Sequence, residues 1–388
     1  MTPSDIEKFA DIRPIRDHEI ENVVSRIVVN PYFKKTVAPY ILPETWNNFS
    51  DKMLSCKTIK EFQDEVSFPI LTKLFEKTHT KISSSNWDNV PRDRQYVFIS
   101  NHRDIVLDAA ILNYLMLSDR RDTVEIAIGD NLLIVPWVSD LSRVNKSFIV
   151  KRSVSMKQLL LESKKLSEYI HDTIVNRQQS IWIAQREGRA KDSDDRTQSS
   201  VLKMLSLYNK SNPLAAFKEL NIIPLSLSYE YDPCDFLKAK EFQMKRDNPT
   251  FKKTFFDDLE NMQTGIVGYK GQVHVQFGNP IVKELSRLSD STDKSRLILQ
   301  VASLIDKEIH KNYFFFKHNY VAYDLMTGSG RFEAKYIKED KDTFEAYISK
   351  QVDKIDLENK DDAFLREKII QMYGNVVKNY LLAVGDQA

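Results

Sequence analysis

The stretch QYVFISNHRDIVLD, residues 95–108, decides how the rest of the chain is interpreted. Residues 96–100 are apolar, aromatic and β-branched, which predicts a short buried strand. Four polar residues, 101–104, follow at once, and a second acid, Asp108, opens an apolar run that predicts a helix. Loops at the carboxyl ends of strands are where α/β folds bind ligands. A histidine in such a loop, beside a carboxylate, can accept a proton near neutral pH.

The same stretch allows two other interpretations. In the first, Asp104 or Asn101 caps the following helix and His102 is a polar loop residue. In the second, His-Arg-Asp at 102–104 is the catalytic loop of a protein kinase. That loop requires an asparagine where this chain has Ala109, and neither a preceding glycine-rich phosphate loop nor a following Asp-Phe-Gly is present. The sequence therefore excludes a kinase.

Composition indicates a globular protein without a strong charge bias. The 388 residues suffice for two average domains, or for one domain with helical extensions. Hydrophobic residues make up 42% of the chain and the mean hydropathy is −0.42, which predicts a sizeable core in a soluble protein. Lys and Arg number 56 against 55 Asp and Glu, a balance that argues against a nucleic-acid partner.

Several absences narrow the class of protein further. The two cysteines, Cys56 and Cys234, form no motif, as is typical of a reducing cytosol. Seven histidines are scattered without metal-ligand spacing, so we expect no metal. The N-terminus has no apolar signal core, and no apolar run approaches the roughly 20 residues that cross a bilayer. We therefore expect a cytoplasmic protein that could meet lipid only at a membrane surface.

Hydrophobic patterns divide the chain into three regions: a helical region at 1–85, an α/β domain at 86–285 and a helical region at 286–388. In the middle region, short apolar runs alternate with helical patterns, which predicts a mostly parallel central sheet covered by helices. The predicted strands are 96–100, 124–128, 148–150, 180–184, 222–229 and 272–277. The polar stretch KISSSNWDN, residues 81–89, is expected to be a linker or turn.

Two further stretches have unusual composition. Residues 238–253 hold six basic residues against Glu241 and Asp247, which indicates a solvated face, or else a segment that meets anionic lipid or an acidic acyl carrier. Residues 312–326 are dense in aromatic side chains. We expect these to pack against the sheet, with the lining of an acyl-chain site as the alternative.

Polar side chains follow four of the predicted strands directly. Because the carboxyl ends of parallel strands lie along one edge of a sheet, these side chains would meet there. Arginine's planar group suits phosphate or carboxylate binding, and Gly188 would let a ligand approach the backbone. No Gly-x-Ser-x-Gly is present, so a serine acyl-enzyme is not indicated. The residues concerned are Asn101, His102, Arg103, Asp104 and Asp108 in the first segment, Lys151 and Arg152 in the second, and Arg186, Glu187, Gly188 and Arg189 in the third. The fourth segment is residues 223–230, which includes most of its own strand.

These four segments resemble the four sequence blocks of the glycerolipid acyltransferase superfamily, which includes 1-acyl-glycerol-3-phosphate and glycerol-3-phosphate acyltransferases. The resemblance covers roughly residues 95–282 and makes 86–285 an acyltransferase domain. The family's first block has four residues between histidine and aspartate, whereas five separate His102 from Asp108 here. We take Asp108 as the partner of His102 because the apolar helix follows it, and we keep Asp104 as the alternative.

The resemblance implies an O-acyltransferase of phospholipid biosynthesis without a bound cofactor. It would move a fatty acyl group from acyl-CoA or acyl-carrier protein to a hydroxyl of a glycerolipid-type acceptor, at the inner face of the cell membrane. A lysophospholipid or lyso-aminolipid acyltransferase, a hydrolase using the same histidine, and a non-catalytic lipid- or phosphate-binding scaffold are the alternatives. The implied catalytic residues are His102 and Asp108, and the implied substrate-binding residues are Arg103, Arg152, Glu187, Gly188 and Arg189.

Overall fold

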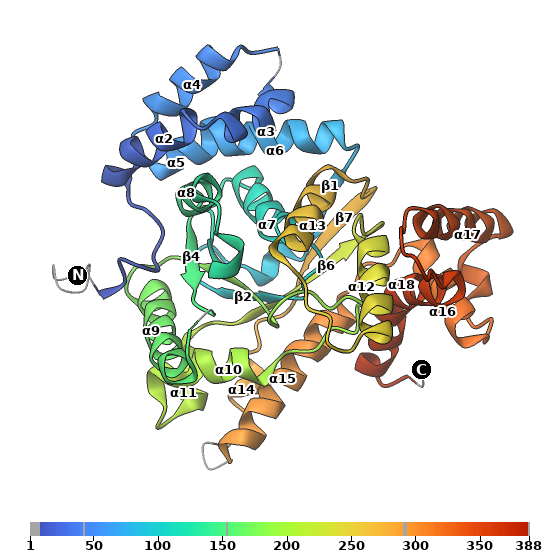
Figure 1. The fold of residues 1–388 in the computed structure, drawn as a ribbon. Helices are drawn as coiled ribbons and strands as arrows, with labels where there is room; N and C mark the ends of the chain where they lie inside the picture. Colours follow the sequence, from blue (N-terminus) through green and yellow to red (C-terminus); the bar gives the residue numbers. More distant parts are fainter. Residues whose placement is uncertain (1–7, 42, 153, 290–292, 387–388) are drawn as a thin grey trace.

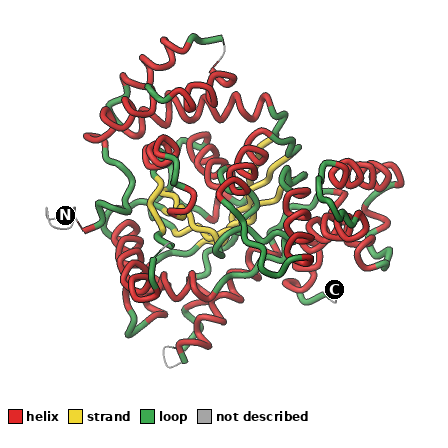
Figure 2. Tube along the Cα trace, viewed as in Figure 1, coloured by secondary structure: helices red, strands yellow, loops and turns green. Residues whose placement is uncertain are grey.

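A seven-stranded sheet lies at the centre of the described part of the chain (Figures 1 and 2). The computed structural model describes residues 8–41, 43–152, 154–289 and 293–386, so the first seven residues of the polar N-terminus lie outside it. The strand order is β1-β7-β6-β2-β5-β3-β4, and every neighbouring pair is parallel except β6 with β7. The strands are β1 (Lys81–Ser85), β2 (Val97–Ser100), β3 (Glu125–Gly129), β4 (Ser147–Val150), β5 (Ile181–Ala184), β6 (Ile223–Tyr229) and β7 (Gln272–Phe277).

Helices cover both faces of this sheet, which confirms the predicted fold class. Strand β2 shows the reason, because all four of its side chains are buried and point alternately into two cores. Val97 and Ile99 pack with side chains of α9, α10, α11 and α15, whereas Phe98 packs with those of α6 and α7. The helices around the sheet are α7 (Leu107–Ser118), α8 (Pro136–Val144), α9 (Met156–Val175), α10 (Ser199–Ser206), α11 (Pro213–Glu219), α12 (Asp235–Asp247), α13 (Phe255–Val267), α14 (Val282–Leu285) and α15 (Lys294–Lys311).

The predicted helical regions lie at the two ends of the chain. The N-terminal helices form their own apolar cluster, which α8 joins, and the C-terminal helices form another with α12. Within the aromatic stretch, Tyr313 is buried in the core against the sheet, as predicted, whereas Tyr323 is buried among side chains of the C-terminal helices. None of the helices in the described ranges is both long enough and apolar enough to cross a bilayer. The end helices are α2 (Ile20–Val28), α3 (Pro31–Ile41), α4 (Trp46–Ser55), α5 (Ile59–Phe62), α6 (Phe68–Lys77), α16 (Lys317–Thr327), α17 (Lys338–Asp353) and α18 (Asp362–Val384).

One local prediction is wrong. The stretch expected to be a linker or turn begins with β1, which pairs in parallel with β7, so the sheet starts at Lys81 and not after residue 86. The strand is at the edge of the sheet, and its side chains are exposed or only half-buried. An edge strand needs few apolar residues, because only one side of its backbone is paired and little of it is covered. Its serines instead bond to His274 of β7.

Candidate active site

The polar motif of residues 101–104 begins where β2 ends, and Asn101 anchors it to the neighbouring strand β6. The Asn101 side chain donates from Nδ2 to the carbonyl of Leu227 at 2.9 Å and accepts from the amide N–H of Leu227 at 2.8 Å. The amide of Asn101 thus pairs with β6 as a further strand residue would. This anchor positions His102 at the carboxyl edge of the sheet.

His102 and Asp108 form the pair that the sequence predicted. His102 Nδ1 lies 2.7 Å from Asp108 Oδ2, and the same oxygen accepts the backbone N–H of Arg103 at 2.6 Å and of Asp104 at 3.1 Å. The extra residue of the loop is therefore accommodated in a turn whose amides point at Asp108. The other oxygen, Oδ1, accepts the hydroxyl of Tyr229 at 2.8 Å. Asp108 is fully buried, as suits a carboxylate held by four donors.

Asp104, the alternative partner of His102, binds backbone amides at the start of α7 instead. Its Oδ1 accepts the backbone N–H of Val106 at 2.9 Å and of Leu107 at 2.7 Å, so it holds the first turn of α7. Burial raises the pKa of the Asp104 carboxyl, and the nearby charge of Asp108 raises it further. This geometry settles the partner of His102 in favour of Asp108.

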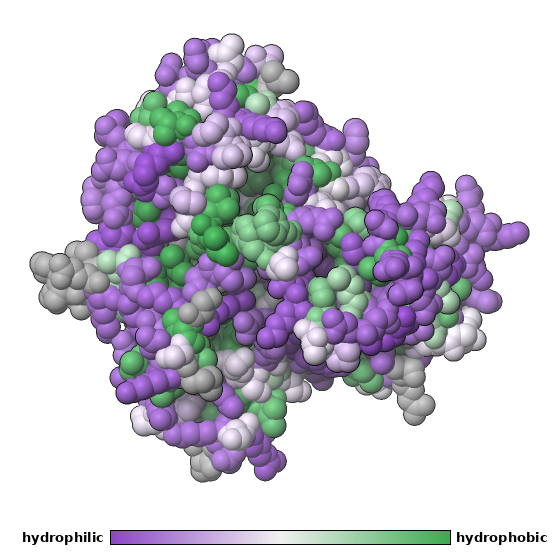
Figure 3. Space-filling model, viewed as in Figure 1, coloured by the Kyte–Doolittle hydropathy of each residue, from purple (hydrophilic) through white to green (hydrophobic). Residues whose placement is uncertain are grey.

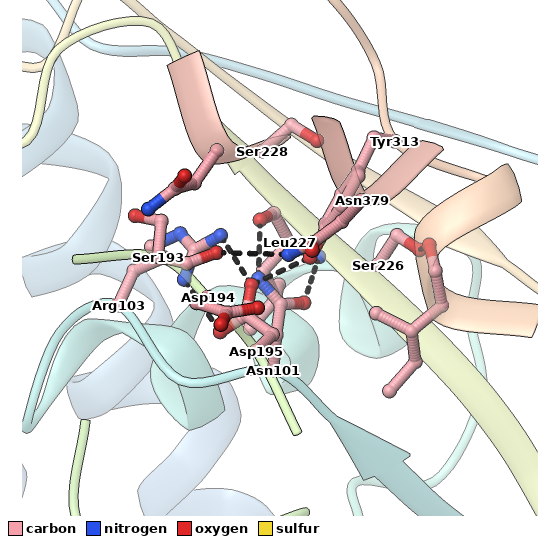
Figure 4. A network of polar contacts seen from close by, with 12 residues as sticks. Asn101, Arg103, Ser193, Asp194, Asp195, Ser226, Leu227, Ser228, Tyr313 and Asn379 are labelled. Carbon is pink, nitrogen blue, oxygen red and sulfur yellow. Dashed lines mark hydrogen bonds and ion pairs between the residues drawn. The ribbon is translucent and has the colours of Figure 1, made fainter. Parts of the chain in front are cut away.

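Arg103 belongs to a buried network behind the motif (Figure 4). Its guanidinium binds both carboxylate oxygens of Asp195, at 2.8 and 2.6 Å, and the hydroxyl of Tyr313 donates to the same carboxylate. Arg103 is 5% exposed and Asp195 is fully buried. Because its donors are already bound to Asp195, the substrate-binding role predicted for Arg103 has no support in this geometry.

The second and third predicted segments follow strands near β2 on the same edge. Ser100 pairs with Ala184 of β5, so the loop that holds Glu187 leaves the sheet next to the loop that holds His102. The exposed side chains of Glu187 and Arg152 face each other, with Arg152 Nη1 3.6 Å from Glu187 Oε1. This pair therefore joins the loops that follow β5 and β4.

Gly188 and Arg189 complete the third segment. Gly188 has φ +75°, and a Cβ there would meet no atom within 4 Å, so the backbone conformation and not crowding favours glycine. Arg189 is 9% exposed and donates from Nη2 to Asn261 Oδ1 at 3.0 Å. Its Nη1 and the Nε of Arg186 are buried and have no hydrogen-bond partner in the described ranges. Both are free to donate to an anionic ligand.

The basic segment predicted at 238–253 is only partly a solvated face. Lys238 is 2% exposed and paired with Asp232, and its Nζ also donates to the carbonyl of Arg103 at 3.0 Å. Glu241 is buried and binds lysines of this segment and Lys191. Lys252 is exposed. The inner half of the segment thus supports the loop of residues 101–108 and does not face solvent.

Two residues near the pair were not assigned a role from the sequence. Tyr229, the last residue of β6, bonds to Asp108, and the Trp182 ring packs edge-on against the His102 imidazole with centroids 5.8 Å apart. Tyr229 is a polar aromatic residue at the carboxyl end of its strand, and that position is the signal that could have identified it. Trp182 is the second residue of β5 and carries no such signal. The His102 side chain is 13% exposed, and its Nε2 has no hydrogen-bond partner among the described residues. An imidazole held at Nδ1 with Nε2 available is arranged for general-base catalysis.

One part of the chain matches a known family in sequence. A family model described as Acyltransferase matches residues 81–227, which include every predicted site residue. Residues 81–227 form an acyltransferase domain. The predicted membership of the acyltransferase superfamily, and with it the prediction of an enzyme, is confirmed for these residues.

Comparisons over the whole chain gave one distant structural match and no curated relative. Among solved structures, the 1-acyl-sn-glycerophosphate (LPA) acyltransferase PlsC from Thermotoga maritima aligns with 77% of this chain and 97% of its own, at 13% sequence identity and a TM-score of 0.38. No curated protein matches the chain significantly.

Proposed function

We propose that this protein is an O-acyltransferase that moves a fatty acyl group from an acyl thioester to a hydroxyl group of a glycerolipid-type acceptor. The observation that carries the proposal is the His102–Asp108 pair, 2.7 Å apart, at the carboxyl edge of the sheet in an acyltransferase domain. The donor is acyl-CoA or acyl-carrier protein. The acceptor class includes 1-acyl-glycerol-3-phosphate and glycerol-3-phosphate, the former being the substrate in the name of the Thermotoga enzyme.

The reaction needs one base and no covalent enzyme intermediate. The acceptor oxygen attacks the thioester carbonyl carbon, a carbon–oxygen bond forms, and the hydroxyl proton passes to His102 Nε2. When the tetrahedral intermediate collapses, the carbon–sulfur bond breaks and the proton passes from Nε2 to the leaving sulfur. Asp108 accepts a hydrogen bond from Nδ1–H of His102. This bond fixes the orientation of the ring and stabilises its positive charge between these steps. General-base help of this kind contributes about 10²–10⁴-fold in rate.

An anionic acceptor head fits the arginines of the third segment. Arg189 Nη1 and Arg186 Nε are buried donors without partners, and such donors are costly to leave unpaired. Phosphate oxygens are acceptors for donors of this kind, and Arg152, whose side chain is partly exposed beside Glu187, adds a third guanidinium to the loops at this edge. Guanidinium groups bind phosphate strongly because they offer parallel N–H donors. We therefore assign Arg152, Glu187, Gly188 and Arg189 to the acceptor site, and we place the protein at the inner surface of the cell membrane.

A thiol-release assay tests this function. Purified protein is mixed with long-chain acyl-CoA and a panel of lysophospholipids and glycerol phosphates, and the lipid products are identified by mass spectrometry. His102→Ala is expected to lower acceptor-dependent turnover by about 10²–10⁴-fold, whereas His18→Ala, at an exposed histidine of the N-terminal helical region, serves as the control.

Three results would contradict the proposal. Equal turnover by the two variants would remove His102 as the base. Thioester loss that does not depend on an acceptor would identify a hydrolase. Absence of turnover with every donor and acceptor, in a folded protein that still binds lipid, would identify a scaffold.

A further inference from the structure

Exposed apolar side chains gather around the carboxyl edge of the sheet. We call five of them the apolar rim, and their exposed fractions run from 42% to 77%. Large apolar residues this exposed are common singly on soluble proteins, but clusters of them mark interaction surfaces. The apolar rim consists of Ile134, Leu160, Leu161, Phe256 and Leu259.

The apolar rim comes from three segments that border the active site. Ile134 lies two residues after the short helix η4 (Asp130–Leu132), which follows β3 and contacts α13. Leu160 and Leu161 lie in the first turns of α9, the helix that follows β4 and Arg152. Phe256 and Leu259 lie at the start of α13. All three segments are thus at the end of the sheet where His102 lies.

Helix α13 ties this surface directly to the catalytic loop. Its Asn261 binds Arg189, and its Gly265 approaches Asp104 so closely that a Cβ there would lie 1.9 Å from Asp104 Oδ2. The inner face of the helix is therefore packed on the site, and Phe256 and Leu259 are on its outer side, open to solvent. Figure 3 shows apolar side chains gathered between α8 and α13 in the middle of this face, with more of them near α9.

Basic side chains accompany the apolar rim. Of the five basic residues at 151–165, four are paired with acidic side chains, whereas Lys157 is exposed next to Leu160 and has no ion pair among the described residues. Lys252, four residues before Phe256, is exposed as well. Apolar side chains beside lysines are the composition that binds anionic lipid surfaces, because the apolar groups enter the boundary between headgroups and acyl chains while the ammonium groups stay at the headgroups.

We propose that the apolar rim docks the enzyme on an anionic lipid bilayer, with the mouth of the active site facing the lipid. This inference rests on the proposed function, since it is a membrane-borne acceptor that gives docking at this edge a purpose. The surface that meets the membrane is thus the apolar rim with Lys157 and Lys252 beside it, and not the helical ends of the chain. A lipid acceptor then reaches His102 without crossing bulk water.

Vesicle flotation tests the docking surface with matched variants. The double variant Ile134→Ser/Leu160→Ser removes side chains that are 61% and 62% exposed. The control Leu299→Ser/Ile337→Ser removes side chains that are 63% and 60% exposed, on α15 and just before α17, away from this edge (Figure 1). On phosphatidylcholine vesicles containing phosphatidylglycerol, the rim variant is expected to bind at least roughly tenfold more weakly than the control, given the transfer free energy of two large aliphatic groups.

A second measurement reports the local environment. Cys56 and Cys234 are buried, so Leu160→Cys and Leu299→Cys can each be labelled selectively with a solvatochromic dye. We expect vesicles to shift the emission at residue 160 towards the blue and to leave residue 299 unchanged, with a smaller effect when phosphatidylglycerol is omitted or salt is raised.

Each contrary result has a definite meaning. Equal flotation of the two double variants would overturn the proposal. So would a blue shift at residue 160 on raising the protein concentration alone, which would indicate a second copy of this chain, or on adding acyl-carrier protein without lipid. Binding is measured without turnover, so a protein that docks normally but transfers no acyl group would refute the proposed function and not the docking surface.

Discussion

Replacing Tyr229 with phenylalanine removes one hydroxyl, which donates to Asp108 Oδ1 at 2.8 Å. Burial, and then the charge of Asp108, hold the pKa of Tyr229 well above its usual value, so the phenol keeps its proton and remains a donor. A hydrogen bond to a charged group contributes about 1.5–3 kcal/mol. In Tyr229→Phe, Oδ1 would lose this donor, while Oδ2 would keep the two backbone amides and His102.

The expected effect on catalysis follows from this arithmetic. If the whole of that free energy serves to hold Asp108 against the imidazole, the loss corresponds to about 10- to 100-fold in kcat, since about 1.4 kcal/mol is tenfold. KM should change little, because Tyr229 acts through Asp108 and the proposed acceptor site is made by other residues. Steady-state turnover of acyl-CoA and the identified acceptor measures both parameters.

Tyr96→Phe is the matched control. Tyr96 is 3% exposed against 7% for Tyr229, belongs to the same apolar cluster, and donates to the carbonyl of Pro91 at 3.1 Å, away from Asp108. Tyr96→Phe should lose less stability in denaturant than Tyr229→Phe, because its hydroxyl bonds to a neutral carbonyl, and only Tyr229→Phe should lose kcat. Similar kcat values for the two variants, with both folded, would refute the positioning role of Tyr229.

Three further outcomes concern stability. Asp195→Asn should lower the free energy of unfolding by about 3–5 kcal/mol in urea titration, because it leaves the buried Arg103 guanidinium without its anion. A loss below about 1 kcal/mol is the value of a surface salt bridge and would contradict this expectation. Burial raises the pKa of Asp235 to about 7 although two tyrosine hydroxyls bond to it. The native state thus holds this proton more tightly than the unfolded state, so the Asp235 contribution to stability should fall as pH rises from about 4 to 7. Asp235→Asn should lack that fall, and identical pH profiles of the unfolding midpoint would contradict the assignment. Gly265→Ala should cost about 1–3 kcal/mol through overpacking on Asp104, and an unchanged denaturation midpoint would show that α13 is not held closely there.

The sheet was largely predictable because its interior strands must be apolar. Six predicted strands overlap β2 to β7, and the buried residues of β2 explain why a run of apolar side chains was a sufficient signal. Strand β1 escaped prediction because hydrogen bonds to β7, and not burial, hold it in place. Its sequence, with three serines in a row, has the composition of a loop.

The site was predictable where neighbours in sequence are neighbours in space. His102 and Asp108 are six residues apart, and the apolar helix after Asp108 identified the partner correctly. Arg103 shows the limit, because Asp195 lies 92 residues further along the chain and nothing near either residue indicates the pair. An arginine that binds substrate and one that binds a buried aspartate have the same local sequence.

The network around Arg103 also bears on where this protein could be cut. The family match ends at residue 227, yet Tyr229, Gly265 and Tyr313 lie beyond that point. Tyr229 and Gly265 contact Asp108 and Asp104 in the loop of residues 101–108, and Tyr313 bonds to Asp195, the partner of Arg103. A fragment ending at residue 227 would open the Asp195 carboxylate to water and remove the helix that packs on Asp104. The range that matches the family model is thus shorter than the range needed to hold His102 in place. We expect the smallest fragment that folds on its own to extend into the C-terminal third of the chain.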